Sequence, residues 1–236
     1  MREISVAVCV SGEIRGNPQK TFEQMRKFFP NARYLYCTWL PVDYDSENPV
    51  PLDLPEGEDI GLHDRPIINY HPYGDMMAYA RCARLEDKIP KFMADPKEVE
   101  RTSHQTKQII AHANMVRDNP GYDVYVRSRW DIKIHDNADM MKYVEDAYDN
   151  ERAIGFGSPM GTWGKESEAT GPYRDFFIMD QMIIHSAKVF DPQMVYDMTE
   201  EKKLIAAEWG WWQVMSQHSG DNHRCIQGIA NKEAHV

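Results

Sequence analysis

The first forty residues carry a β-α-β pattern, which constrains the fold more than any other part of the sequence. Residues 4–10 form a continuous apolar run that ends in Ser11-Gly12, as in a strand buried on both faces and followed by a tight turn. Apolar side chains then recur near helical spacing from 18 to 29, and residues 32–39 form a second strand. Two such strands joined by a helix require a crossover and parallel pairing. We therefore expect an α/β fold with a mostly parallel central sheet flanked by helices.

The remaining sequence continues this alternation of helical and extended patterns. Strand patterns occur at 121–131, 153–156, 176–179 and 182–184, and helical patterns occur at 75–93, 97–117, about 137–148, 192–199 and 202–217. The stretch from 41 to 72 is rich in Pro, Asp, Glu and Gly, which predicts an irregular excursion with one short strand at 66–70. The residues after about 222 show no strong pattern.

The composition limits the classes of function. A chain of 236 residues with 42% hydrophobic and 27% charged residues is long enough for one globular domain with a sizeable core. A formal charge of −10 argues against sequence-independent nucleic-acid binding, which needs a basic surface, so an anionic ligand would need a local cationic pocket. Four scattered cysteines and the lack of any apolar run near ~20 residues predict a cytoplasmic protein without a transmembrane segment.

Charged residues follow directly on the strand pattern at 121–131. Alternation along a strand would place Tyr125, Arg127, Arg129 and Asp131 on one side. Ligands of open α/β sheets bind at the carboxyl ends of the strands, and Arg with Asp there suits a phosphate-bearing ligand, with or without a divalent cation. The alternative is an Arg–Asp salt bridge that caps the strand.

The first βα turn offers a second group of candidates. It contains Ser11, Gly12 and Arg15, and it matches neither the G-x-G-x-x-G dinucleotide motif nor a phosphate-binding P-loop. Gly12 would let a ligand approach the backbone closely, and Arg15 would pair with a phosphate or stack beside a base. A plain turn with a solvated arginine is the alternative.

Two carboxylates are candidates for a general base. Glu208 falls in an apolar helical stripe with Leu204, Trp211 and Met215, where an unpaired carboxylate has a raised pKa. The alternative is a buried Glu208 tied to an arginine or to the backbone. Asp180, at the end of the pattern at 176–179, is the rival base, and its alternative role is a helix N-cap.

Several short motifs together resemble a known family. The motifs are the early strand-Ser-Gly-x-x-Arg, then Thr102-Ser103-His104-Gln105, then Tyr-Asp-Val-Tyr-Val-Arg-Ser-Arg-Trp-Asp, and finally Met179-Asp180-Gln181 with Ile184-His185-Ser186-Ala187-Lys188. Over residues 4–215 the chain resembles bacterial and viral glycosyltransferases of the GT-A fold that are associated with lipopolysaccharide and capsule synthesis. The resemblance implies a single Rossmann-like GT-A domain over 1–236, with a nucleotide-binding part at 1–70 and a metal and acceptor part at 121–218.

The resemblance also implies roles for individual residues. The nucleotide-sugar donor would contact the opening turn with Ser11, Gly12 and Arg15, while Asp131 would match the last aspartate of an Asp-x-Asp that holds Mn or Mg. The set of expected substrate-binding residues is completed by Gln105, Arg127, Arg129 and Gln181.

These roles imply transfer of a sugar from a nucleotide-diphosphate donor to an acceptor hydroxyl of a glycan, with Glu208 or Asp180 as the base. The sequence departs from the family at Arg129, which stands where the first aspartate of Asp-x-Asp is expected. Arg127 and Arg129 would then neutralise the departing diphosphate themselves. The same departure favours the alternative of a non-catalytic nucleotide-binding or assembly protein that retains the fold.

Overall fold

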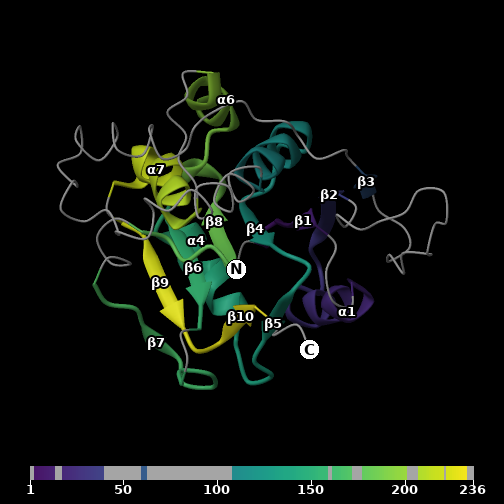
Figure 1. Cartoon of the computed structure of the whole chain (residues 1–236), viewed down its shortest axis with the longest axis vertical. Helices are drawn as coiled ribbons and strands as arrows, with labels where there is room; N and C mark the ends of the chain where they lie inside the picture. The colour runs from purple at the N-terminus through teal and green to yellow at the C-terminus, as the bar shows by residue number, and fades with distance from the viewer. Residues whose placement is uncertain are drawn as a thin grey trace, which may run out of the picture.

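A central sheet organises the molecule. The computed structural model describes residues 3–13, 18–39, 60–62, 108–158, 161–171, 177–200, 207–220 and 222–232. Its eight-stranded sheet crosses Figure 1 from right to lower left in the order β3 (Ile60–Leu62), β2 (Arg33–Trp39), β1 (Val6–Glu13), β4 (Val124–Ser128), β8 (Met182–Ser186), β6 (Ala153–Gly157), β9 (Arg224–Gln227) and β7 (Ser167–Glu168).

The sheet is mostly parallel, as the sequence predicts. Strand β1 pairs in parallel with both β2 and β4, and helix α1 (Pro18–Phe28) makes the crossover from β1 to β2. Strand β8 runs antiparallel between β4 and β6, and β9 returns to the parallel direction beside β6. The prediction of a Rossmann-like α/β fold is therefore confirmed.

Helices cover both faces of the sheet. Helices α1 and α4 (Met141–Asp149) pack on one face, where they join Val8 and Val126 in one apolar cluster. A helix over 108–118 and helix α7 (Ala207–Ser219) share the other cluster with Ala7 and Tyr125. The described residues also form the short η3 (Ala187–Val189) and α6 (Pro192–Glu200). Helix α6 lies at the top of Figure 1. Alternate residues of β1 and β4 thus face opposite layers, as expected for buried strands.

Several predicted elements differ from the structure. The expected strand at 121–131 ends at Ser128, and residues 177–179 form no strand, since only Asp180 makes an isolated bridge to Phe156. Five of the described strands escaped prediction: β3, β7, β9, and the antiparallel pair β5 (Ile132–Ile134) and β10 (Ala230–Lys232). Runs of two to four residues are too short to establish a period of two. The predicted strand at 66–70 and helix at 75–93 lie outside the described residues.

Gly155 in β6 is pressed against the chain segment that leads to Asp180. A Cβ at Gly155 would lie 2.5 Å from the Met179 carbonyl oxygen and 2.7 Å from its nitrogen, so the backbone would have to move. We expect Gly155→Ala to lower the free energy of unfolding by about 1–3 kcal/mol, as overpacking does, in a urea titration. Gly157→Ala in the same strand is the matched control, because there the nearest atom is the flexible Met179 Sδ at 3.2 Å. Equal losses in the two variants would contradict this account.

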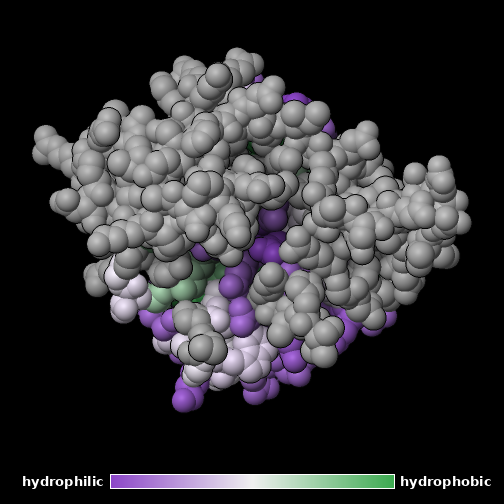
Figure 2. Space-filling model, in the orientation of Figure 1, coloured by the Kyte–Doolittle hydropathy of each residue, from purple (hydrophilic) through white to green (hydrophobic). Residues whose placement is uncertain are grey.

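The described surface visible in Figure 2 is mostly hydrophilic, with one small apolar area. Met141 and Trp163 are the large apolar side chains that are exposed among the described residues. In that same part of the chain, no helix has both the length and the apolar character needed to span a bilayer.

Candidate functional site

The two segments singled out in the sequence meet at one edge of the sheet. Strands β1, β4 and β6 all end there, because they run in the same direction. Val10 pairs in register with Ser128, so Ser11 and Gly12 lie next to the turn that follows β4. The carboxyl ends of parallel strands are where ligands of such sheets bind. This edge is therefore the candidate site.

Ser11 and Gln108 bring unsatisfied polar atoms to this edge. Ser11 is fully buried, and neither its Oγ nor the buried Oε1 of Gln108 has a hydrogen-bond partner among the residues that the structure describes. Gly12 has a φ of 112°, and a Cβ there would lie 3.5 Å from Gln108 Nε2, so the amide packs against the carboxyl end of β1. Buried polar atoms without partners cost about 1–3 kcal/mol each, which a polar ligand would recover.

Gln108 was missed at the sequence level. The sequence does hint at Gln108, because it lies three residues after the predicted Gln105. In the predicted helix over 97–117, side chains three residues apart would lie on the same face. Gln105 and Arg15 themselves lie outside the described residues.

Arg129 and Asp131 form a bidentate ion pair. Arg129 Nε donates to Asp131 Oδ1 at 2.8 Å and Nη2 donates to Oδ2 at 2.9 Å. The side chains are 14% and 2% exposed, respectively. Between them, Thr21 of α1 donates to the Trp130 carbonyl oxygen at 2.5 Å and the Trp130 ring stacks on Tyr36. These contacts end β4 in a tight turn, so the salt bridge considered as the alternative is the arrangement in this structure.

The described residues do not fit a resident divalent cation. Both carboxylate oxygens of Asp131 already accept hydrogen bonds from Arg129. Within the described ranges, no three His, Cys, Asp or Glu side chains are grouped so that they would hold a metal ion. Mn and Mg sites in proteins use free carboxylate oxygens together with phosphate and water oxygens.

Arg127 lies underneath the site. The side chain is fully buried, its Nη1 donates to the Asp180 carbonyl oxygen, and its Cζ lies 5.2 Å from the centre of the Trp211 ring. Burial lowers the pKa of Arg127 to about 10, so the guanidinium stays charged at neutral pH. Arg127 thereby links β4 to the segment that carries Asp180 and to α7.

Asp180 reaches the same edge from the neighbouring strand. It lies just before β8, is 7% exposed, and is held by its bridge to Phe156 and by the hydrogen bond from Arg127. Asp180 precedes a strand, so the alternative of a helix N-cap is wrong. The next residue, Gln181, packs beside Gly157: a Cβ added at Gly157 would lie 3.5 Å from Gln181 Oε1.

Glu208 completes the charged cluster from the start of α7. Its side chain is half-buried in the first helical turn, where a negative charge interacts favourably with the helix dipole, and its carbonyl oxygen accepts a hydrogen bond from Ile178 N–H. Trp211 and Met215 of the predicted stripe are buried, whereas Leu204 lies outside the described residues.

Arg129 connects these carboxylates electrostatically. Burial alone would lower the pKa of Arg129, but Asp131, Asp180 and Glu208 outweigh burial and raise it. Asp131 contacts the Arg129 guanidinium directly, while Asp180 and Glu208 act on it through their charge. Such a cluster of charges with a shifted pKa is typical of functional sites.

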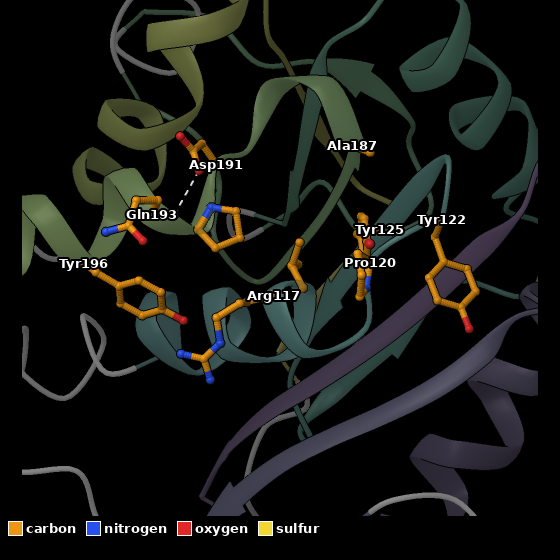
Figure 3. A pocket seen from close by; sticks show the side chains of 11 residues that line it. Arg117, Pro120, Tyr122, Tyr125, Ala187, Asp191, Gln193 and Tyr196 are labelled. Atoms are coloured by element: carbon orange, nitrogen blue, oxygen red, sulfur yellow. Dashed lines mark hydrogen bonds between the residues drawn. The ribbon is translucent and has the colours of Figure 1, made fainter.

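A separate cavity of ≈ 400 Å³ lies at the amino end of β4, on the opposite edge of the sheet. Tyr125 and Tyr196 are among the residues that line it (Figure 3). The Arg117 guanidinium lies 5.3 Å from the centre of the Tyr196 ring. None of the residues proposed from the sequence as site residues lines this cavity. The charged edge and this cavity are thus distinct sites.

Comparison with known proteins finds solved structures that are similar to this chain, but no similar sequence family. No protein-family model matches the sequence, and no curated protein matches it. One similar solved structure is a glycosyltransferase involved in the glycosylation of the major capsid of PBCV-1, with 8% identity, a TM-score of 0.42, and coverage of 98% of this chain and 96% of that chain. Another is mannose-1-phosphate geranyltransferase from Thermus thermophilus, with 10% identity, a TM-score of 0.40, and coverage of 96% of this chain and 75% of that chain. Because both TM-scores lie below 0.5, the function proposed below rests on the residues of the site.

Proposed function

We propose that this protein is a glycosyltransferase that moves a sugar from a nucleotide-diphosphate donor to a hydroxyl of a glycan. The observation that supports it most is that Ser11 and Gly12 lie beside the segment with the Arg129–Asp131 pair at one edge of the central sheet, where the charge of Glu208 also acts on Arg129. A donor diphosphate needs cationic hydrogen-bond donors, and an acceptor hydroxyl needs a base. In this proposal, Arg129 supplies the donors and Glu208 supplies the base.

In the proposed reaction, the bond between the sugar C1 and the diphosphate oxygen breaks, and its electron pair leaves with the diphosphate. A bond forms between C1 and the acceptor oxygen, and the acceptor proton passes to the Glu208 carboxylate. The N–H groups of Arg129 stabilise the negative charge on the leaving diphosphate. Ser11, Gly12 and Gln108 contact the nucleotide, together with Arg15 and Gln105 by resemblance.

Exposure distinguishes the two candidate bases. Asp180 is 7% exposed and its backbone is fixed by Arg127 and Phe156, whereas Glu208 is half-buried at a helix start. A base must come within hydrogen-bond distance of a hydroxyl that arrives from solvent. We therefore assign proton transfer to Glu208 and orientation of the sugar or acceptor to Asp180 and Gln181.

The proposed function is tested by a panel of UDP- and GDP-linked sugars, with CMP-linked sugars as the arm that carries only one phosphate. We expect one nucleotide class to raise the melting temperature, because a ligand present at 100 times its dissociation constant stabilises a protein by roughly 2.7 kcal/mol. The same donor should release its nucleotide when a glycan acceptor is added, which chromatography would detect. A panel without any shift would contradict the proposal.

A non-catalytic nucleotide-binding protein is the second candidate. The observation in its favour is that Arg129 occupies both oxygens of Asp131, the residue that resembles a metal ligand. This candidate predicts a thermal shift without release of nucleotide from any donor. Binding and turnover measured on the same protein sample separate the two functions.

A further inference from the structure

The Arg129–Asp131 pair has the same net charge as the metal site that the resemblance would place there. Two aspartates and a divalent cation sum to zero, and so do one aspartate and one arginine. Replacement of the first aspartate by Arg129 therefore removes the need for a cation to balance Asp131. The bidentate contact, at 2.8 and 2.9 Å, shows that the arginine is placed to do so.

The pair also keeps hydrogen-bond donors for an anion. A guanidinium carries five N–H groups, and Arg129 uses two of them on Asp131. The Arg129 side chain makes no further hydrogen bond to any residue that the structure describes. The three remaining N–H groups match the fork geometry in which arginine binds phosphate oxygens.

The position of the guanidinium is fixed before any ligand arrives. Asp131 is 2% exposed, and the intervening Trp130 is held by Thr21 and stacked on Tyr36. Rotating Arg129 away would break both hydrogen bonds that the buried Asp131 carboxylate accepts from it, which is costly. A donor group that does not reorganise during the reaction is the most effective stabiliser of a leaving group.

We propose that the Arg129–Asp131 pair takes the place of a divalent cation at the donor diphosphate, so that this protein binds its donor without metal. This inference rests on the proposed function and specifies the chemistry of its leaving-group site. Arg129 contacts the diphosphate, and Asp131 acts as a positioning residue through Arg129.

The test measures by calorimetry how tightly the protein binds UDP and GDP, once in EDTA and once in MnCl2. UMP and GMP, which lack the second phosphate, are measured in the same buffers. We expect the preferred diphosphate to bind wild-type protein about equally in both buffers. Arg129→Gln should weaken this binding by about 10- to 100-fold, which is the effect of a charge-assisted hydrogen bond, and should affect the monophosphate less. Arg129→Asp, which gives Asp-x-Asp, should bind weakly in EDTA and recover at least tenfold in MnCl2.

Arg117→Gln is the matched control, since Arg117 also pairs with a neighbouring aspartate, Asp118, but on the opposite edge of the sheet. It should bind as wild type does. Melting temperatures identify any variant that fails to fold, and the comparison of buffers on wild-type protein needs no variant. Diphosphate binding by wild type that requires MnCl2, or unchanged binding by Arg129→Gln, would overturn this inference alone. Absence of binding by every nucleotide would overturn the proposed function and this inference with it.

Discussion

Glu208→Gln is expected to lower turnover by about 10²- to 10⁴-fold, the usual contribution of a general base, while donor affinity stays within about twofold of wild type. The amide keeps the size of the side chain but has no basic oxygen for the acceptor proton. Because Glu208 stands at the first turn of α7 and is half-buried, we expect the variant to fold normally. Initial rates with a saturating donor, together with donor affinity by calorimetry, measure the two effects separately.

Two further variants control this experiment. Glu145→Gln, on the exposed surface of α4, should leave turnover unchanged. Asp180→Asn should reduce turnover through a higher KM for the acceptor, since the proposed role of Asp180 is orientation. If Asp180→Asn removes turnover while Glu208→Gln retains most of it, the two assignments are reversed.

The second large effect concerns a buried histidine pair between β8 and the helix over 108–118. His112 Nε2 and His185 Nε2 lie 2.8 Å apart, and His185 Nδ1 donates to the Ser186 carbonyl oxygen at 2.9 Å. Both rings are fully buried. Burial lowers the pKa of His185 from 6.5 to about 4. Burial also lowers the pKa of His112, and the nearby His185 and Arg127 lower it further.

This pair makes stability depend on pH. Both histidines have lower pKa values in the folded than in the unfolded protein, so the unfolded state binds more protons below pH 6.5. The stabilisation is therefore present above pH 6.5 and is lost as the pH falls toward the folded pKa. Between pH 6.5 and 5, we expect His185 to account for a loss of roughly 1–2 kcal/mol, with His112 adding to it.

Urea unfolding at half-unit steps between pH 7.5 and 5 measures this loss, in a range where most carboxylates stay ionised. His185→Phe should give a flatter profile, because phenylalanine retains the contacts with Tyr125 and Phe190 but does not titrate. His218→Gln is the control, since His218 is exposed near the end of α7, and it should keep the wild-type slope. A wild-type profile that is flat from pH 6.5 to 5 would contradict this account.

The sequence by itself determined the elements whose patterns are long and local. The strand-helix-strand start and the buried strand from Val124 are set by side-chain periodicity and by turn residues, which act over a few positions. The parallel pairing of β1 and β2 follows from the single helix between them. The sequence also located Ser11 and Gly12 near the carboxyl end of the first strand, but the predicted turn there is wrong, because β1 continues through both residues to Glu13.

Only the tertiary structure decided which charges meet. Arg127 and Arg129 are two positions apart in sequence, yet burial under α7 binds the first to Asp180 while the end of β4 turns the second onto Asp131. Glu208 joins them because α7 packs beside the segment at 177–180. These pairings depend on burial and on contacts between segments that are distant in the sequence. The local periodicity of side chains determines neither of them.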